Sequence, residues 1–225
     1  MKAAVLFSGQ LRHLFNPKIK DNIFSFLKRN TTSFDFYCSF WDFDEIDKIN
    51  SNYSPIKIES EEWGSWEQNN QNLVDTFINN NNIPHRYAIG GILGQWYQIN
   101  KCFSLIENPQ EYDIIIRTRT DITFPIFDIT HLDLSYLYVE GPYIGDYGYK
   151  DYFFFSNPKN MKHVTNLFSN INSLTFSLNH PHPSAHYQHI LAEHVFKSHV
   201  DEKCDVKYFA YDGNPEHTEY FKKIR

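Results

Sequence analysis

The chain has 225 residues with ordinary proportions of hydrophobic (41%) and charged (21%) side chains, which exclude a disordered chain and a membrane protein. Its formal net charge of -6 argues against nucleic-acid binding, because such proteins normally carry a basic patch, so we expect no nucleic-acid partner. The length suits a single α/β domain over residues 1–225.

Cysteine usage and the amino terminus both favour a cytosolic protein. The three cysteines, Cys38, Cys102 and Cys204, have unrelated spacings that form no disulfide framework or zinc site, so we expect small core residues. The first apolar run ends at Ser8, too early for a secretory signal or a membrane span. We therefore expect a cytoplasmic location, in the host cytoplasm if the chain is viral, and no stable membrane insertion.

The first predicted element is a buried strand, Ala3 to Phe7, which leads into a polar loop. In this loop Gly9 lets the backbone approach a ligand, while Ser8 and Gln10 can hydrogen-bond one. Arg12 can pair with a phosphate group through two hydrogen bonds. A lone glycine turn after a strand is also a common structural feature, so the loop alone does not identify a site.

A helix and a second strand complete a βαβ unit. Asn16 as N-cap and Pro17 at the first helical position predict a helix start, and apolar residues then recur at helical spacing up to Leu27. The strand expected at Phe34 to Phe40 should pair in parallel with the first strand, through a right-handed crossover.

The next region is expected to be mostly surface. A short strand at Pro55 to Glu59 precedes a polar, Asn-rich region, Ser60 to Pro84, which cannot bury much apolar area. We expect a loop there, with a short helix near Leu73 to Ile78.

Beyond Gly90-Gly91, apolar residues at helical spacing predict a helix that ends at Asn108-Pro109. The polar positions Gln95, Gln98 and Lys101 are expected to face water or a cleft.

The following strand changes character at its middle. Tyr112 to Ile116 is largely apolar and β-branched, as in the centre of a parallel sheet, whereas Arg117, Arg119 and Asp121 follow at its carboxyl end. Ligands of open α/β sheets bind at that end, and guanidinium groups match phosphate oxygens, so we expect a nucleotide or sugar phosphate there. A salt-bridge network without a ligand is the alternative. The phosphate loop of P-loop kinases and the GxGxxG of dehydrogenases are both missing.

The carboxyl-terminal part is expected to contain a strand at Tyr136 to Glu140, a loop at Gly141 to Lys150, a strand at Asp151 to Phe155 and a helix from Asn157-Pro158.

A last helix carries several histidines, among them His186, His189 and His199, but it lacks the two-His metal spacing with a central Glu. We therefore expect an ordinary helix there.

Several of these segments resemble viral and bacterial glycosyltransferases of the GT-A fold. The resembling segments are Met1 to Arg12, Tyr112 to Asp121, Phe36 to Trp41 and Gln95 to Tyr97, and more loosely Asp151 to Ser156 and Glu193 to His199. The resemblance implies a GT-A-like, Rossmann-like α/β fold, with a mostly parallel central sheet and helices on both faces. It also implies transfer of a sugar from a nucleotide-diphosphate sugar to a hydroxyl of a glycan or glycoconjugate.

In that family an Asp-x-Asp motif holds Mn²⁺ or Mg²⁺ on the donor diphosphate. The aligned triplet here is Arg119-Thr120-Asp121, which leaves Asp121 as the one metal ligand. Two mechanisms stay open: Mg²⁺ held by this carboxylate with phosphates and waters, or neutralisation of the diphosphate by arginine without a metal. The donor-binding residues implied by the resemblance are Ser8, Gly9, Gln10, Arg12, Arg117, Arg119, Thr120 and Asp121.

An inverting transfer needs a carboxylate to take the proton from the acceptor hydroxyl. Asp151, at a strand entrance, is the first candidate and Glu193 the second; a loop cap and a solvated helix residue are their alternative roles. A retaining transfer needs no such base. Two other functions stay open: a sugar-nucleotide nucleotidyltransferase, which the single glycine of the first loop disfavours, and a non-catalytic nucleotide-sugar or glycan-binding domain, which the missing first acid favours.

Overall fold

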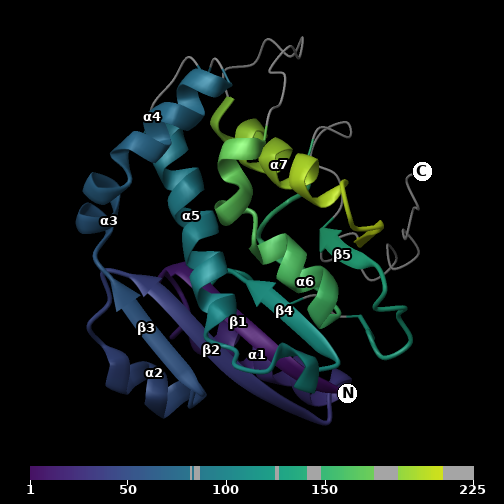
Figure 1. Ribbon diagram of the computed structural model, residues 1–225. Coiled ribbons are helices and arrows are strands. Elements are labelled where there is room, and N and C mark those ends of the chain that lie inside the picture. Colours follow the sequence, from purple (N-terminus) through teal and green to yellow (C-terminus); the bar gives the residue numbers. More distant parts are fainter. Residues whose placement is uncertain (82, 84–86, 125–126, 141–147, 175–186, 210–225) are drawn as a thin grey trace.

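A computed structural model of the protein describes residues 1–81, 83, 87–124, 127–140, 148–174 and 187–209 (Figure 1). These residues form an α/β fold around a seven-stranded sheet with the order β3-β2-β1-β4-β6-β5-β7. The strands are β1 (Lys2–Gln10), β2 (Ser33–Trp41), β3 (Lys57–Glu61), β4 (Ile114–Thr118), β5 (Leu137–Glu140), β6 (Phe153–Ser156) and β7 (Val206–Phe209).

The pairing of the strands confirms the predicted, mostly parallel sheet. Strand β1 pairs in parallel with β2 and β4, β2 with β3, and β5 with β7, whereas β6 is antiparallel to both β4 and β5. The carboxyl ends of β1, β2 and β4 therefore meet at one edge of the sheet.

Helices cover both faces of the sheet, as predicted. Alternate residues of β1 face opposite sides: Ala3, Val5 and Phe7 pack with the apolar residues of α1 and α2, while Ala4 and Leu6 pack with those of α4 to α7. Figure 1 shows α4 to α7 gathered on one side of the sheet. The helices are α1 (Pro17–Asn30), α2 (Ile46–Tyr53), α3 (Trp63–Asn69), α4 (Gln71–Asn80), α5 (Tyr87–Ser104), α6 (Pro158–Thr165) and α7 (Tyr187–Val200), with 3-10 turns at Pro109–Glu111 and Phe168–Ser173.

The start of α1 and the roles of two cysteines are confirmed. The Asn16 side chain accepts a hydrogen bond from the Lys18 backbone N–H at 3.0 Å, as an N-cap does. Cys38 and Cys102 are fully buried free thiols, whereas Cys204 is half-buried.

The predicted polar loop after the first strand is wrong in part, because β1 continues to Gln10. Ser8, Gly9 and Gln10 pair in parallel with the end of β2, and Gly9 adopts a φ of 103°, a conformation that favours glycine. The polar residues therefore lie on a rigid strand end.

The loop expected between Ser60 and Pro84 is also wrong, since α3 and α4 occupy most of it. Trp66, Val74 and Phe77 provide a buried apolar stripe that the surrounding Asn residues conceal in the sequence. The short helix expected near residues 73–78 lies within α4.

Helix α5 differs from the prediction at both ends and on its polar face. It includes Gly90 and Gly91 and ends at Ser104. Gln98, expected to face water or a cleft, is fully buried, where the Ser39 hydroxyl donates to its side-chain oxygen. This hydrogen bond satisfies the side-chain oxygen of Gln98, whereas its buried side-chain nitrogen has no hydrogen-bond partner among the described residues.

Helix α2 and strand β7 were not expected from the sequence. The helix predicted from Asn157-Pro158 is α6, which ends at Thr165 and is followed by the 3-10 turn Phe168–Ser173. Residues 141–147 and His186 lie outside the described residues. Across the described helices, none is both long and apolar enough to cross a membrane.

Candidate functional site

A cavity of about 230 Å³ lies where β1, β2 and β4 end. All eight predicted donor-binding residues line it, together with Trp41, Trp63, Gly91 and Gln95. The register explains this convergence, because Gln10 at the end of β1 lies opposite Trp41 of β2, and Phe7 opposite Thr118 of β4. Parallel pairing thus brings residues that are about a hundred positions apart in the chain to the same edge.

The lining of this cavity is positive although the chain as a whole is negative. It contains the guanidinium groups of Arg12, Arg117 and Arg119 and the carboxylate of Asp121: three positive charges and one negative charge. The formal net charge of the chain is -6. A local excess of two positive charges in a concave site favours an anionic ligand.

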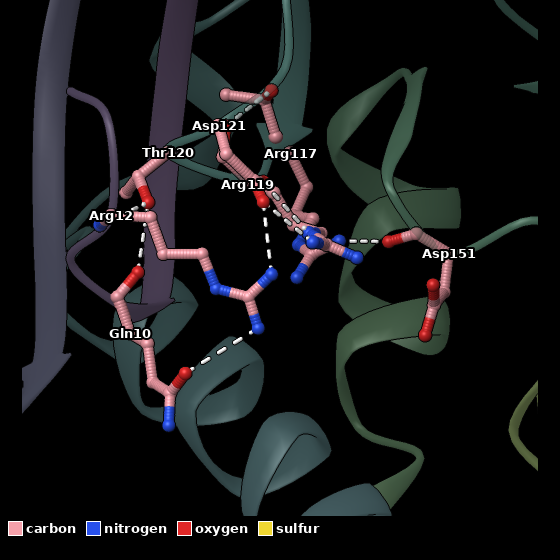
Figure 2. A network of polar contacts seen from close by, with 8 residues as sticks. Gln10, Arg12, Arg117, Arg119, Thr120, Asp121 and Asp151 are labelled. Atoms are coloured by element: carbon pink, nitrogen blue, oxygen red, sulfur yellow. Dashed lines mark hydrogen bonds and ion pairs between the residues drawn. The ribbon is translucent and has the colours of Figure 1, made fainter. Parts of the chain in front are cut away.

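Two of the arginines converge on the single carboxylate (Figure 2). Arg119 donates from Nε to Asp121 Oδ1 at 2.9 Å and from Nη2 to Oδ2 at 2.7 Å, and Arg12 donates from Nη1 to Oδ2 at 2.9 Å. Burial raises the pKa of Asp121, but the hydrogen bonds and charges of the two arginines outweigh it and hold that pKa below its ordinary value. Asp121 is therefore an ionised counter-ion at neutral pH.

Thr120 joins the two strand ends beneath this ion pair. Its hydroxyl donates to the backbone oxygen of Gln10 at 2.8 Å and accepts the backbone N–H of Arg12 at 3.1 Å. Thr120 is almost fully buried. The backbone that carries Arg12 is thus held against the backbone that carries Asp121.

Arg117 is fully buried at the base of the cavity. Its Nη1 donates to the backbone oxygen of Asp151, and its Nε donates to the Ser8 hydroxyl at 3.4 Å. Burial lowers its pKa to about 10, with the Asp151 charge acting in the opposite direction. The guanidinium therefore keeps its charge at neutral pH.

Arg119 is held by Tyr152 as well as by Asp121. Its guanidinium carbon lies 4.9 Å from the centre of the Tyr152 ring, and its backbone N–H donates to the backbone oxygen of Tyr152 at 3.0 Å. A planar guanidinium stacked on an aromatic ring has a defined orientation.

The two predicted catalytic carboxylates lie behind the cavity and outside its lining, as far as the described residues define it. Asp151 is buried, and its Oδ2 accepts a hydrogen bond from Nε2 of Gln95, which does line the cavity. Glu193 is 3% exposed on α7, so the alternative role of a solvated helix residue is wrong. Burial raises the pKa of Glu193 to about 8, with a smaller contribution from the Asp151 carboxylate.

Trp41 and Trp63 form an aromatic wall in the lining of the same cavity. The two indole rings lie 5.1 Å apart at an interplanar angle of 86°. The Asp42 carboxylate accepts a hydrogen bond from the backbone N–H of Trp63 at 3.0 Å. Asp42 itself adopts a left-handed backbone conformation, with a φ of 48°. Gly94 leaves room for the Trp63 ring, because a Cβ there would lie 2.3 Å from it.

Sequence reasoning missed Trp41, Trp63 and Gly91 as cavity residues, whereas Gln95, expected to face water or a cleft, does line the cavity. The spacing of Trp63 and Trp66 would place both on one side of a helix, but the surrounding polar residues favoured a loop. Tyr97, which ends the resembling segment Gln95 to Tyr97, packs flat against Trp41, with the ring centroids 5.8 Å apart.

The donor atoms present do not fit a divalent cation. Both Asp121 oxygens accept hydrogen bonds from guanidinium groups, and the described residues contain no group of three His, Cys, Asp or Glu side chains arranged to hold a metal ion. A cation on Asp121 would have to displace these arginines while lying close to them.

No protein-family model matches this chain, and no curated protein matches it in sequence. Among solved structures, the fold is similar to the apo form of mouse xyloside xylosyltransferase 1, with a TM-score of 0.43 and 10% identity, over 90% of this chain and 82% of that chain. A similarity of this degree carries no inference about a substrate.

Proposed function

We propose that this protein is a GT-A-like glycosyltransferase that moves a sugar from a nucleotide-diphosphate sugar to a hydroxyl of a glycan acceptor. The observation that carries the proposal is the cavity at the strand ends, whose lining contains three arginines and two indoles. Guanidinium groups bind phosphate oxygens, and indole faces stack on nucleobases or sugars. The resemblance of Met1 to Arg12 and Tyr112 to Asp121 to GT-A enzymes supports the same ligand.

The size of the cavity suits part of such a donor. Its volume of about 230 Å³ is below the roughly 300–1,000 Å³ of typical ligand pockets. A diphosphate with one attached ring is the portion that we assign to it.

The arginines would stabilise the departing diphosphate. As the bond from the sugar to the diphosphate breaks, the nucleoside diphosphate leaves with the electron pair and gains negative charge. Arg117 and Arg119 are fixed before the reaction by their contacts with Asp151 and Tyr152. Preoriented charges of this kind lower the barrier without reorganisation at the moment of reaction.

For an inverting transfer, Asp151 is the better candidate base. Glu193, with a pKa of about 8, is mostly protonated at neutral pH and is therefore the poorer proton acceptor there. Gln95 orients the Asp151 carboxylate from the cavity side. Asp151 would take the proton of the acceptor hydroxyl while that oxygen bonds to the sugar carbon.

The test is turnover with a panel of nucleotide sugars, including UDP-glucose, UDP-xylose and GDP-mannose, with glycan acceptors and with or without Mn²⁺. We expect release of nucleoside diphosphate with at least one donor, and a loss of about a hundredfold or more in Arg117→Met. Arg29→Met, on the exposed surface of α1, is the matched control and should keep full activity.

Two outcomes would contradict the proposal. Binding of nucleotide sugars without transfer or hydrolysis under every metal condition would indicate a binding domain. Formation of a nucleotide sugar from a nucleoside triphosphate and a sugar phosphate would indicate a nucleotidyltransferase.

A further inference from the structure

We infer that Asp121 is a positioning residue that holds Arg12 and Arg119 as a clamp for a diphosphate, which this site binds without a divalent cation. The inference deepens the proposed function and rests on it for the identity of the ligand as a diphosphate. It reverses the role expected for this carboxylate, which the sequence resemblance assigns to a metal.

Both oxygens of the Asp121 carboxylate accept hydrogen bonds from arginine. Asp121 Oδ1 accepts from Arg119 at 2.9 Å, and Oδ2 accepts from Arg119 at 2.7 Å and from Arg12 at 2.9 Å. Hydrogen bonds between charged groups are the strongest that side chains make. A cation on this carboxylate would have to compete with these contacts, and it would lie beside two groups of its own charge.

Arg12 and Arg119 keep N–H donors that their contacts within the protein do not use. Arg12 uses Nη1 for Asp121 and Nη2 for the side-chain oxygen of Gln10, and Arg119 uses Nε and Nη2 for Asp121. Each guanidinium group carries more N–H donors than these contacts use. Both side chains line the cavity, and that of Arg12 is 47% exposed. The remaining donors are therefore available to phosphate oxygens.

The guanidinium groups of Arg12 and Arg119 need a counter-ion to lie side by side. Two guanidinium groups side by side repel each other, and an exposed arginine has many rotamers. The guanidinium of Arg119 is also held by the Tyr152 ring. The guanidinium of Arg12 contacts Asp121 and, at the longer distance of 3.4 Å, the side chain of Gln10. Asp121 therefore fixes the position of Arg12 above all. Figure 2 shows Arg12 and Arg119 approaching Asp121 from different elements.

The experiment measures the affinity for inorganic pyrophosphate and for UDP by calorimetry, in excess chelator and then with Mn²⁺, for the wild type and Asp121→Asn. A positioning role predicts binding in chelator, and a loss of about tenfold in Asp121→Asn that is the same with and without Mn²⁺. A metal-ligand role predicts that the substitution matters only when Mn²⁺ is present.

Controls separate positioning from folding. Asp121→Glu, which keeps the charge, should recover part of the lost affinity, and thermal unfolding should show that Asp121→Asn is folded. Asp128→Asn, an exposed carboxylate on the same loop, should bind like the wild type.

Binding that requires Mn²⁺ would overturn the metal-free clamp and leave the transferase proposal intact. Absence of pyrophosphate and UDP binding under all conditions would contradict both.

Discussion

Single residues decide the chemistry of the strand end. Asp121 pairs with two arginines, and Arg117 lies fully buried beneath them. Arginine keeps its charge even when burial lowers its pKa, so the site stays positive over the physiological pH range. A lysine in the same surroundings would lose its proton more readily.

Glu193 gives a prediction about pH and stability. Its pKa in the folded protein, about 8, lies above the ordinary value of 4.5. Between these values the folded carboxyl keeps a proton that the unfolded chain releases, so the wild type loses stability as the pH rises. Glu193→Gln removes this loss. We expect the free energy of unfolding of Glu193→Gln to exceed that of the wild type by about 2 kcal/mol at pH 8, after allowance for solvent screening, and by little at pH 4.5.

The measurement is the melting temperature of both proteins from pH 4.5 to pH 8. Glu202→Gln, exposed just beyond α7, is the control for removing one negative charge. An advantage of Glu193→Gln that does not grow with pH would show that the buried carboxyl is ionised throughout.

At the scale of elements, α3 contributes Trp63 to the aromatic wall of the cavity, and β2 contributes Trp41. The wall depends on Gly94 of α5, because a methyl group there would overlap the Trp63 ring. Gly94→Ala should lower the unfolding free energy by about 1–3 kcal/mol, as overpacking does, and weaken UDP binding by about tenfold. Gly64→Ala, in α3 itself with open space around its Cα, is the matched control. Unchanged binding in Gly94→Ala would remove Trp63 from the ligand site.

Helices α6 and α7 are joined by two stacked histidines. The rings of His163 and His199 lie 4.3 Å apart, and each Nε2 donates to the backbone oxygen of the other residue at 2.9 and 2.8 Å. Burial lowers the pKa of His199 below its ordinary value of 6.5. The unfolded chain therefore takes up a proton that the folded protein resists, and stability is lost as the pH falls through 6.5.

Between pH 7.5 and pH 5.5 we expect the free energy of unfolding to fall by on the order of 1 kcal/mol more in the wild type than in His199→Gln, after allowance for solvent screening. Denaturant unfolding at the two pH values measures this difference. The Glu193 contribution is common to both proteins and cancels. His131→Gln, a highly exposed histidine, is the control. Equal losses in the wild type and His199→Gln would show that this pair does not sense acid.

At the scale of the whole molecule, the sequence predicts the sheet better than its surroundings. Continuous apolar runs such as Ile114 to Ile116 mark buried strands, and Asn16-Pro17 marks a helix start by local chemistry. The antiparallel direction of β6 leaves no such mark, because an apolar run reads the same in both directions. Helix α3 was missed, and α4 was predicted only as a shorter helix, because their stability comes from packing onto the fold and not from their composition.

The same reasoning explains which part of the site was predicted. Arg12, Arg119 and Asp121 follow strands directly, so the parallel sheet alone brings them together. Trp63 and Gln95 reach the cavity only because α3 and α5 fold back over the strand ends. The pairing of Asp121 with both arginines depends on side-chain geometry, which no spacing encodes.

The central claim, that this cavity binds the diphosphate of a nucleotide sugar, is tested most directly by a crystal structure of the protein with UDP or GDP bound. The account predicts phosphate oxygens within hydrogen-bonding distance of Arg12 and Arg119, and a ring of the ligand against Trp41 or Trp63. A nucleotide bound elsewhere on the molecule would contradict this claim, whereas one held at Asp121 through a metal ion, with the arginines displaced, would contradict only the metal-free clamp.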